Sequence, residues 1–568
     1  MKLPYGQSNF KNMATQGFYY VDRTRYIEEL EDLSARFLFY LRPRKFGKSL
    51  FISMLEHYYG EQWKGAFQAL FGQYYIGQRP TPLANTYLVL TLDFSGIGTD
   101  SSERVLHSFN SSLYASISRF VSTYLPQLDR DSLMSLEGES YPADLMNRFL
   151  AIVKREFPDK KLYMLIDEYD HFANELIAFR LNDFKEMVSR NGFVRKFFEV
   201  IKRETRDGLV DRLFATGVSP VTLDSLTSGF NIGKKVMGEL HLHEMMGFTE
   251  AEAVAMLAHV GVGEVQMPAV LNDIRQWYNG YLFHPDAAQR LYNPNMLIYF
   301  CDHYQSNGRY PEKLLDENIA SDYGKISRML GVGGESYSLP ILEKVLTEGR
   351  INAELTAQFS FDRPWVRDDY VSLLYYLGVL TVQDRAGSFW SFSIPNFVIK
   401  VLYYNYFLET LRQRADLKSY FYNDVSDAFY ELSMENKLSP MLAVLEQILS
   451  RLSGRDVVHF GESHLHAIFA SLLTTAQGYL VRSQPEIARK FVDILCVHLP
   501  HVPVNWNFAF ELKYLKKNDA TQLESKKAEA RSQMMGYLQT EDLQHIPHLA
   551  AYIIVVVGDA VAHVEQVS

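Results

Sequence analysis

Residues 35–55 read ARFLFYLRPRKFGKSLFISML, and this stretch determines the fold expected for the first third of the chain. Its apolar beginning predicts a buried strand, and Gly47-Lys48-Ser49 opens a helical pattern after a polar loop. Glycine lets backbone N–H groups approach phosphate oxygens, lysine neutralises their charge, and a serine hydroxyl can ligate Mg²⁺. The stretch therefore predicts a phosphate-binding loop, although Arg42 stands where the pattern G-x-x-x-x-G-K-[ST] has its first glycine.

A second acidic element lies further along the chain, where LYMLIDEYD (162–170) ends an apolar run in Asp167-Glu168. In phosphoryl transfer, a carboxylate in the first position holds Mg²⁺ through water, and one in the second polarises the attacking water. Solvated carboxylates at a strand end are the alternative, but the upstream GKS loop favours a nucleotide site. We predict Ser49 and Asp167 as metal ligands and Glu168 as a catalytic residue.

Further polar residues extend this nucleotide site. Thr216 ends the strand LFATGV and either senses the γ-phosphate or caps the strand, and Asp93 ends another strand as a more distant acid. Arg42, Arg44 and Lys45 either contact phosphate, act across a subunit interface, or form a solvated loop. The residues predicted to bind ATP are Arg42, Arg44, Phe46, Gly47, Lys48, Ser49, Leu50, Asp167 and Thr216.

The pattern of apolar runs predicts an α/β multidomain protein. Strands at 35–41, 86–95, 161–169 and 211–218 are nearly continuously apolar and separated by helical intervals, which is typical of a parallel sheet covered on both faces. We therefore expect an α/β domain at 1–235. A mainly helical region follows at 236–415, and within it 368–402 predicts a helix, a hairpin and a helix, as in a winged-helix-like module. Residues 416–568 predict the order αβββαβ.

Length and composition limit the classes of protein to which the chain can belong. Its 568 residues suggest three or four domains, and 47% hydrophobic with 22% charged residues excludes wholesale disorder. A net charge of −10 excludes a uniformly basic coat for nucleic acid. Two cysteines, Cys301 and Cys496, exclude a disulfide framework and a zinc cluster. We find no signal peptide or membrane-spanning run, and we expect a soluble cytoplasmic protein.

A second group of charged residues lies near the end of the chain. Asp493 lies in FVDILCVHL, and Glu511 and Lys513 lie two apart in WNFAFELKYL, so the latter two share one face of a strand. Two carboxylates bind Mg²⁺ or Mn²⁺, and a nearby ammonium can orient water for attack on a phosphodiester. The alternative is that these are ordinary charges on the solvent-exposed face of a strand. Glu511, however, interrupts an otherwise apolar strand. We predict Asp493, Glu511 and Lys513 as catalytic, with the two acids as metal ligands.

Accessory residues support this second site. Glu462 on the preceding helix, and Gln533 and Tyr537 four apart on the following helix, are candidates. Residues 511–531 contain six basic and four acidic residues, and this local excess of positive charge allows a phosphate-facing surface. His464 and His466 lie on different faces of a helix, so we do not expect a metal-binding pair.

The motifs together resemble a bacterial family. LPYGQSNF, FYYVDRTRYIEEL, FLFYLRPRKFGKSLFISML, LIDEYD, TGVSPVTLDSLTSGFNI, MGFTEAEA, WYNGYLF and LYNPNML look like the AAA-ATPase-like proteins that carry a C-terminal PD-(D/E)XK nuclease domain. The resemblance implies a P-loop NTPase core, a helical lid with a winged-helix-like segment, and a restriction-endonuclease-like C-terminal domain. It also implies that arginine in place of the first glycine is normal, and that Val21–Thr24 lies near the nucleotide.

One segment departs from the family pattern. Such nuclease domains often carry an acidic S-E-x-E-x-G-x-G-R-x-D run, whereas this chain reads SQPEIARKFVD, with Gln484 in place of the first acid and both glycines missing. Glu486 and Asp493 remain. Metal affinity or the approach of DNA is altered if the run matters here, and a degenerate nuclease is an open alternative.

The resulting hypothesis is an ATP-hydrolysing protein coupled to metal-dependent cleavage of nucleic acid, with DNA the expected partner. ATP and Mg²⁺ are the expected cofactors, with Mn²⁺ an alternative at the nuclease site; no membrane contact is expected, and a homo-oligomer is possible. The main alternative is a nucleotide-gated switch whose degenerate nuclease domain binds DNA or a protein without cutting. A small-molecule kinase is disfavoured by the second phosphate-chemistry domain.

Overall fold

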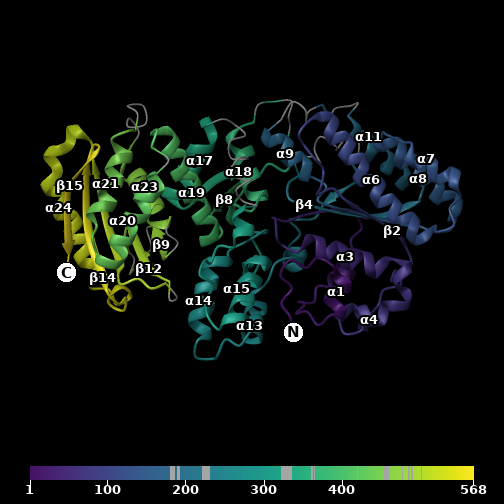
Figure 1. Ribbon diagram of the computed structural model, residues 1–568, viewed down its shortest axis with the longest axis horizontal. Coiled ribbons are helices and arrows are strands. Elements are labelled where there is room, and N and C mark those ends of the chain that lie inside the picture. Colours follow the sequence, from purple (N-terminus) through teal and green to yellow (C-terminus); the bar gives the residue numbers. More distant parts are fainter. Residues whose placement is uncertain are drawn as a thin grey trace. The chain divides into compact units, whose positions relative to one another are not determined.

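The computed structural model describes residues 1–179, 184, 186–187, 192–220, 230–321, 335–359, 363, 365–418, 420–452, 460–475, 478–483, 486–487, 490–499 and 502–567 (Figure 1). The chain divides into two compact units. The first comprises Met1–Gly308, Asp316–Ser338 and Asn352–Pro395, and the second comprises Arg309–Leu315, Leu339–Ile351 and Asn396–Ser568. The division into three domains at 235 and 415 stays a prediction.

The first unit is built on a parallel sheet. Within the described ranges its five strands are β1 (Phe37–Leu41), β2 (Leu88–Asp93), β3 (Leu162–Asp167), β4 (Val210–Gly217) and β5 (Lys234–Lys235), in the spatial order β2-β3-β4-β1-β5. Every neighbouring pair is parallel. The four strands expected from apolar runs are β1 to β4, whereas the two-lysine β5 carries no apolar signal. Because β4 separates β1 from β3, the carboxyl end of β4 lies between the phosphate-binding loop and Asp167.

Helices cover both faces of this sheet. Figure 1 shows α3 with α1 and α4 on one side and α6, α8 and α11 on the other. The nearly uninterrupted burial of β3 follows from this covering. The bounds are α1 (Phe10–Thr15), α2 (Tyr26–Glu31), α3 (Lys48–Tyr59), η1 (Glu61–Ala66), α4 (Phe67–Phe71), α5 (Tyr75–Gln78), α6 (Ser102–Tyr124), α7 (Arg130–Glu137), α8 (Pro142–Glu156), α9 (His171–Phe179) and α11 (Phe193–Arg206).

The rest of the first unit is mainly helical, as predicted. It contains η2 (Leu240–Met245), α13 (Glu250–His259), α14 (Met267–Tyr278), α15 (Pro294–Asn307), α18 (Arg367–Tyr376), and the strands β6 (Ile351–Glu354), β7 (Thr381–Ala386) and β8 (Phe389–Ser393). The start of α13 is fixed by a capping box between Thr249 and Glu252. The helix and hairpin expected over 368–402 are α18 and β7–β8, and the second helix is α19 (Phe397–Arg414), which belongs to the second unit. β6 joins the hairpin in the order β6-β8-β7.

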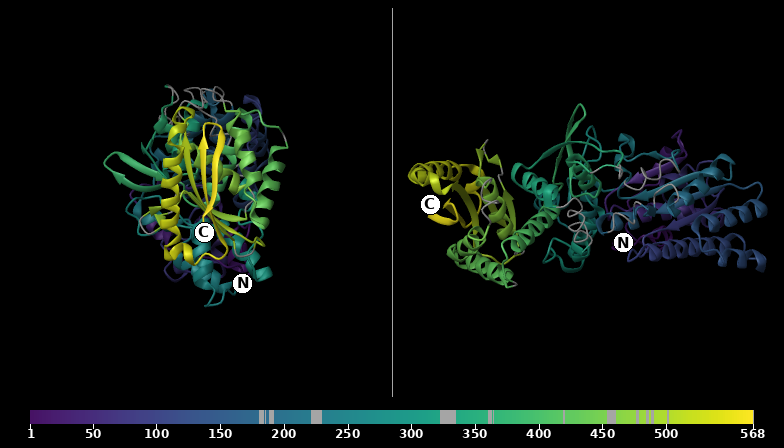
Figure 2. Two further views of the ribbon diagram at one scale, coloured as in Figure 1. Left: turned by 90° about the vertical axis from the view of Figure 1, so that its left-hand side faces the viewer. Right: turned by 90° about the horizontal axis from the view of Figure 1, so that it is seen from above.

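The second unit contains a mixed sheet in the order β15-β14-β13-β12-β9 among its described strands. The predicted order αβββαβ is present as α23, β9, β12, β13, α24 and β14, and β15 adds an edge strand. Figures 1 and 2 show α24 on one face of the sheet and α21 and α23 on the other. The bounds are α17 (Glu335–Glu348), α20 (Phe421–Glu435), α21 (Ser439–Leu449), α23 (Glu462–Thr474), β9 (Tyr479–Ser483), β10 (Glu486–Ile487), β11 (Lys490–Phe491), β12 (Ile494–His498), β13 (Asn507–Leu515), η3 (Lys517–Gln522), α24 (Leu523–Leu538), α25 (Glu541–Gln544), β14 (Leu549–Val557) and β15 (Ala560–Val567).

Strand direction in this sheet fixes where its charged residues meet. β13 runs parallel to β14 and antiparallel to β12, and Ile494 of β12 is opposite Phe510. Asp493, just before β12, therefore lies beside Glu511. In the described part of the chain, no helix has both the length and the apolar character required to cross a membrane.

Candidate functional sites

The loop between β1 and α3 has the backbone of a phosphate cradle. Gly47 has a φ of 92° and Lys45 a φ of 66°, so the chain reverses sharply before the helix begins at Lys48. No side chain caps the first turn of α3, which leaves its N–H groups directed at the space in front of the helix. An anion is favoured at such a helix start because the N–H groups and the helix dipole both point toward it.

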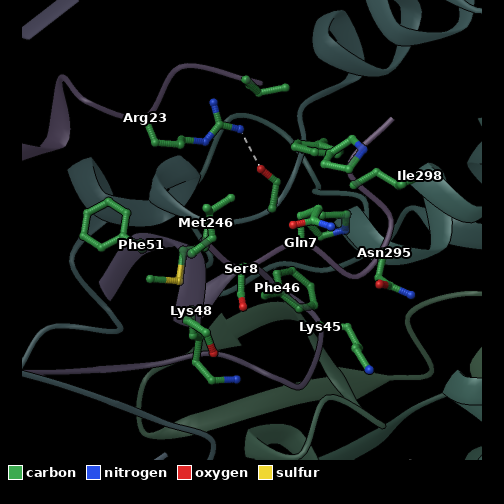
Figure 3. A pocket seen from close by; sticks show the side chains of 18 of the residues that line it. Gln7, Ser8, Arg23, Lys45, Phe46, Lys48, Phe51, Met246, Asn295 and Ile298 are labelled. Carbon is green, nitrogen blue, oxygen red and sulfur yellow. Dashed lines mark hydrogen bonds between the residues drawn. The ribbon is translucent and has the colours of Figure 1, made fainter. Parts of the chain in front are cut away.

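A pocket of about 400 Å³ opens beside this loop, a size common for small-molecule sites. Figure 3 shows Lys48 at one end and Arg23 at the other, with Phe46, Phe51 and Met246 between them. Six of the nine residues predicted to bind ATP line it: Arg44, Phe46, Gly47, Lys48, Ser49 and Leu50. Val21 and Arg23, from the segment expected near the nucleotide, line it as well. The pocket therefore extends from the cradle to the N-terminal segment.

Lys48 is held by the cradle itself. Its Nζ donates to the carbonyl oxygens of Arg42 and Pro43, at 3.0 Å each. Burial lowers the pKa of the ammonium, while the charges of Glu168 and Asp167 act in the opposite direction. An ammonium bonded to two loop carbonyls is poised to exchange them for phosphate oxygens, which are stronger acceptors.

Asp167 and Thr216 meet because β4 lies between β1 and β3. The Thr216 hydroxyl donates to Asp167 Oδ1 at 2.7 Å, and both side chains are buried. Burial raises the pKa of Asp167, against hydrogen bonds from Ser49 and Thr216 that lower it. The structure thus brings together Ser49, Asp167 and Thr216. Asp93 pairs with Asp167 in the sheet register but is exposed, and its carboxylate accepts from the Ser95 N–H.

Glu168 lies at the pocket wall in a left-handed backbone conformation, with φ 49°. His171 Nδ1 is 3.1 Å from its Oε2. Burial would raise the pKa of Glu168, but the hydrogen bond from His171 and the charge of Lys48 outweigh it and lower the pKa to about 2. The carboxylate is therefore ionised and fixed by a partner that the sequence analysis did not identify.

Arg42 differs from its prediction as a phosphate ligand, because its side chain lies away from the pocket. The guanidinium is fully buried and stacks on the rings of Tyr40 and Phe283, at 4.4 and 4.0 Å from their centroids. It donates to the carbonyl oxygens of Leu41, Met237, Leu242 and His243, at 3.0 to 3.4 Å. Arg42 therefore ties the base of the cradle to residues 237–243 instead of reaching phosphate, and only its own carbonyl contacts Lys48.

The second site is a buried cluster of charges in the mixed sheet. Asp493, Glu511 and Lys513 are 7%, 1% and 5% exposed, far less than charges on the wet face of a strand. Asp493 Oδ2 accepts from the Leu512 N–H at 2.7 Å, and Lys513 Nζ donates to Glu511 Oε1 at 2.8 Å. Lys513 Nζ is also 3.6 Å from Glu462 Oε1. The structure brings all four predicted residues together.

Proton affinities in this cluster reflect two acids sharing a buried space. Burial, followed by the charge of Asp493, raises the pKa of Glu511 to about 7, although Lys513 acts against both. Burial lowers the proton affinity of Lys513, but Glu511 outweighs it and raises the pKa of the ammonium. A buried carboxylate of raised pKa beside a second acid is characteristic of sites that hold a cation, which would favour the ionised form again.

His466, on α23, belongs to the cluster, although the sequence analysis set it aside. Its Nε2 is 3.4 Å from Asp493 Oδ2, and its side chain is 4% exposed. Burial would lower the pKa of His466, but the Asp493 carboxylate outweighs it and raises the pKa. His464 instead stacks on Phe460.

Two buried polar atoms of this cluster, His466 Nδ1 and Glu511 Oε2, have no hydrogen-bond partner among the described residues, and neither has Gln533 Oε1 on α24. Such atoms cost free energy unless a ligand, a water or an ion satisfies them. No group of three or more His, Cys, Asp or Glu side chains in the described ranges forms a complete metal site. The two carboxylates with these atoms fit a hard divalent cation that completes its shell with water or backbone oxygen.

Tyr537, an accessory residue on α24, lies near the same cluster. Tyr537 is 4% exposed, and burial followed by the charges of Glu511 and Asp493 raises its pKa to about 12. Gln533 lies one turn earlier on the helix. Gln484, at which the acidic run departs from the family pattern, lies outside the described residues.

Two family models match the regions that contain the two clusters. Residues 4–227 match the family model described as predicted AAA-ATPase, and residues 460–566 match that of the PD-(D/E)XK nuclease superfamily. The chain joins an AAA-ATPase-like domain to a PD-(D/E)XK nuclease-family domain. The resemblance inferred from the motifs is confirmed.

A relative and a solved structure are also similar to parts of this chain. The Azotobacter chroococcum mcd 1 protein "Uncharacterized protein in vnfD 5'region" is 26% identical over 304 residues, 53% of this chain and 52% of that protein. The chain thus spans about half the length of this curated relative. The Walker-type ATPase PABY2304 of Pyrococcus abyssi shares 13% identity with a TM-score of 0.36, covering 67% of this chain and 94% of that one.

Charges around α24 of the nuclease-family domain are mostly paired locally. Lys526 and Lys527 bond Glu529 and Glu524 on the same helix, at 2.7 and 2.6 Å. Arg531 lies 3.4 Å from Glu565, and Lys517 lies 2.9 Å from Asp559. Most of the basic side chains that would allow a phosphate-facing surface are therefore paired with acids of the same domain.

Replacing the buried Arg42 should destabilise the AAA-ATPase-like domain. Arg42→Ala removes the guanidinium donor of four carbonyl oxygens and leaves an empty space between two rings, so we expect a loss of about 3 kcal/mol or more in the free energy of unfolding. Denaturant unfolding measures it. Arg36→Ala removes an exposed arginine paired with Asp211 and should cost under about 1 kcal/mol. Equal losses in the two variants would contradict a bracing role for Arg42.

His243, whose carbonyl oxygen accepts a hydrogen bond from Arg42, should make the stability of this domain depend on pH. Burial and then the charge of Arg42 lower its pKa from 6.5 to about 4. Between pH 6.5 and about 4, His243 is protonated in the unfolded chain but neutral in the folded chain. The free energy of unfolding therefore falls as the pH drops through this window, by a total of about 3 kcal/mol. His243→Gln should flatten the dependence of Tm on pH in this window. His241→Gln, at an exposed neighbour, should leave it unchanged.

Proposed function

We propose that this protein binds and hydrolyses ATP and that the nucleotide cycle controls metal-dependent cleavage of a nucleic-acid phosphodiester, with DNA as the substrate. The observation that carries the proposal is the buried cluster of Asp493, Glu511 and Lys513, whose unpartnered oxygen and neighbouring imidazole suit a bound cation. Two buried acids and a lysine are costly for a domain that only packs or scaffolds. Their cost is explained if the cluster performs chemistry.

In the nucleotide site, Ser49 and Asp167 would hold Mg²⁺, which supplies charge stabilisation for the transferred phosphoryl group. Lys48 leaves its loop carbonyls and binds the β- and γ-phosphates, while the N–H groups at the start of α3 bind the remaining oxygens. Thr216, bonded to Asp167, would sense the γ-phosphate. Glu168, ionised at the pocket wall, orients the attacking water.

In the nuclease-family domain, Asp493 and Glu511 would hold Mg²⁺ or Mn²⁺, which lowers the pKa of a bound water and stabilises the departing oxygen. Lys513, anchored to Glu511, positions the attacking water from the same strand face. Glu462 steadies that ammonium, and Gln533 and Tyr537 border the phosphate from α24. Water adds across the broken P–O bond, so the expected products are two fragments, one ending in a phosphate monoester and the other in a hydroxyl group.

Cleavage assays with purified wild type test the proposal directly. Supercoiled plasmid and single-stranded DNA are incubated with Mg²⁺ or Mn²⁺, with and without ATP, and ATP hydrolysis is measured in the same tubes. Cutting that requires a divalent cation supports the nuclease. Equal cutting by wild type and Lys48→Ala, whether or not ATP is present, would contradict nucleotide control while leaving the nuclease intact.

A second candidate is a nucleotide-gated switch whose C-terminal domain binds DNA or a protein without cutting. The local pairing of Lys526, Lys527 and Arg531 favours it, because paired lysines and arginines contribute little to phosphate binding. This candidate predicts ATP hydrolysis without cutting under any condition. It also predicts that Glu511→Ala leaves partner binding unchanged.

A further inference from the structure

His171 occupies an unusual position at the edge of the nucleotide pocket. It is the first residue of α9, three residues after Glu168, and it lines the pocket. Each ring nitrogen has a carboxylate beside it: Nδ1 is 3.1 Å from Glu168 Oε2, and Nε2 is 3.7 Å from Glu175 Oε1. The imidazole is mostly buried, with 17% of the side chain exposed, so its orientation is fixed by these two acids.

Glu175 is held in place by a further hydrogen bond. The Thr99 hydroxyl donates to Glu175 Oε2 at 2.9 Å, and Thr99 lies in the loop that follows β2. A continuous series of side chains, Thr99, Glu175, His171 and Glu168, therefore runs from the β2 loop to the pocket wall. Every contact in the series lies within the first unit.

Glu168 needs such support because its backbone is in the left-handed region, at φ 49°. That conformation costs a residue with a Cβ about 1 kcal/mol or more and persists only where neighbours fix it. His171 contacts Oε2 of the carboxylate, which leaves Oε1 for a water. A group that must orient a water gains from one oxygen being held and the other free, as in base–orienter pairs of other hydrolases.

We propose that His171 is the positioning residue for Glu168, holding the carboxylate in the orientation that directs water at the γ-phosphate, with Glu175 and Thr99 fixing the ring. The inference rests on the proposed ATP hydrolysis at this site. His171 contacts neither nucleotide nor water in this role and acts through Glu168 alone.

Steady-state ATP hydrolysis by His171→Ala, His171→Asn and Glu168→Gln tests the proposal, with fluorescent nucleotide binding measured for each. We expect His171→Ala to lower kcat about tenfold while KM and the Kd for nucleotide stay within about twofold, a loss typical of an outer-shell orienting residue. His171→Asn places an amide donor near the position of Nδ1 and should recover most of the rate. His107→Ala, at an exposed histidine of α6, is the matched control and should have no effect.

The outcomes separate the inference from the proposed function. Wild-type hydrolysis that Glu168→Gln abolishes, with an unchanged or raised kcat in His171→Ala, overturns the positioning role alone. Equal losses in His171→Ala and His171→Asn, accompanied by a weaker Kd and a lower Tm, also overturn it, because they indicate a structural role. No hydrolysis by wild type overturns the proposed function and this inference with it.

Discussion

Lys48→Ala is expected to reduce ATP hydrolysis by about 100-fold or more, the scale seen when a preorganised charge is removed from a reacting centre. Lys48 is 5% exposed and its ammonium donates to two loop carbonyls, so its charge is buried at a cost that phosphate binding would offset. Removing it takes away the cation that faces the β- and γ-phosphates. The measurement is kcat for phosphate release at saturating ATP, together with nucleotide affinity.

The control for this variant is Lys64→Ala, which removes an exposed lysine of η1 in the same unit. It should retain full activity. Folding of Lys48→Ala is checked by its Tm, which should not fall, because a buried cation with lowered proton affinity contributes little to stability. Hydrolysis within about threefold of wild type would contradict the assignment of this loop as the nucleotide cradle.

Glu511→Gln is expected to abolish metal-dependent cleavage, with a loss of about 1000-fold. The amide keeps the shape of the side chain and the oxygen that accepts from Lys513, but it removes the negative charge that a divalent cation needs. Because an ionised carboxylate is costly at a 1% exposed position, the Tm should stay unchanged or rise. Activity lost without stability lost separates a functional acid from a structural one.

Glu524→Gln is the matched control, since Glu524 lies on α24 of the same domain, is exposed and pairs with Lys527. Its cleavage rate should equal that of wild type. Isothermal titration with Mn²⁺ adds a second readout, and binding should weaken in Glu511→Gln alone. Full cutting by Glu511→Gln would assign the cleavage to a contaminant or to another site.

The sequence predicted strands with strong local patterns and residues whose role depends on short spacing. Gly47, Lys48 and Ser49 lie where a strand–loop–helix pattern requires, and Glu511 and Lys513 share a face because strand period is two. Asp493 was paired with them correctly because a hairpin links the two strands. Local geometry carried these predictions, and no long-range information was needed.

Three residues show where local reasoning failed. Arg42 was placed at phosphate because it stands in a phosphate-loop motif, but its burial depends on residues 237–243, far along the chain. His466 was compared only with His464, whereas its partner Asp493 comes from another strand. His171 carries no motif, although its spacing of three from Glu168 and four from Glu175 on a helix start was a usable signal.

The brace between Arg42 and residues 237–243 restricts how this cradle can be exchanged. An imported loop that begins with glycine would fill the phosphate site correctly and still leave four carbonyl oxygens and two aromatic faces without their partner. The cradle loop and residues 237–243 should therefore be exchanged together in any chimaera or recombination library. Loop grafts should fold only when the donor also supplies its own counterpart of residues 237–243.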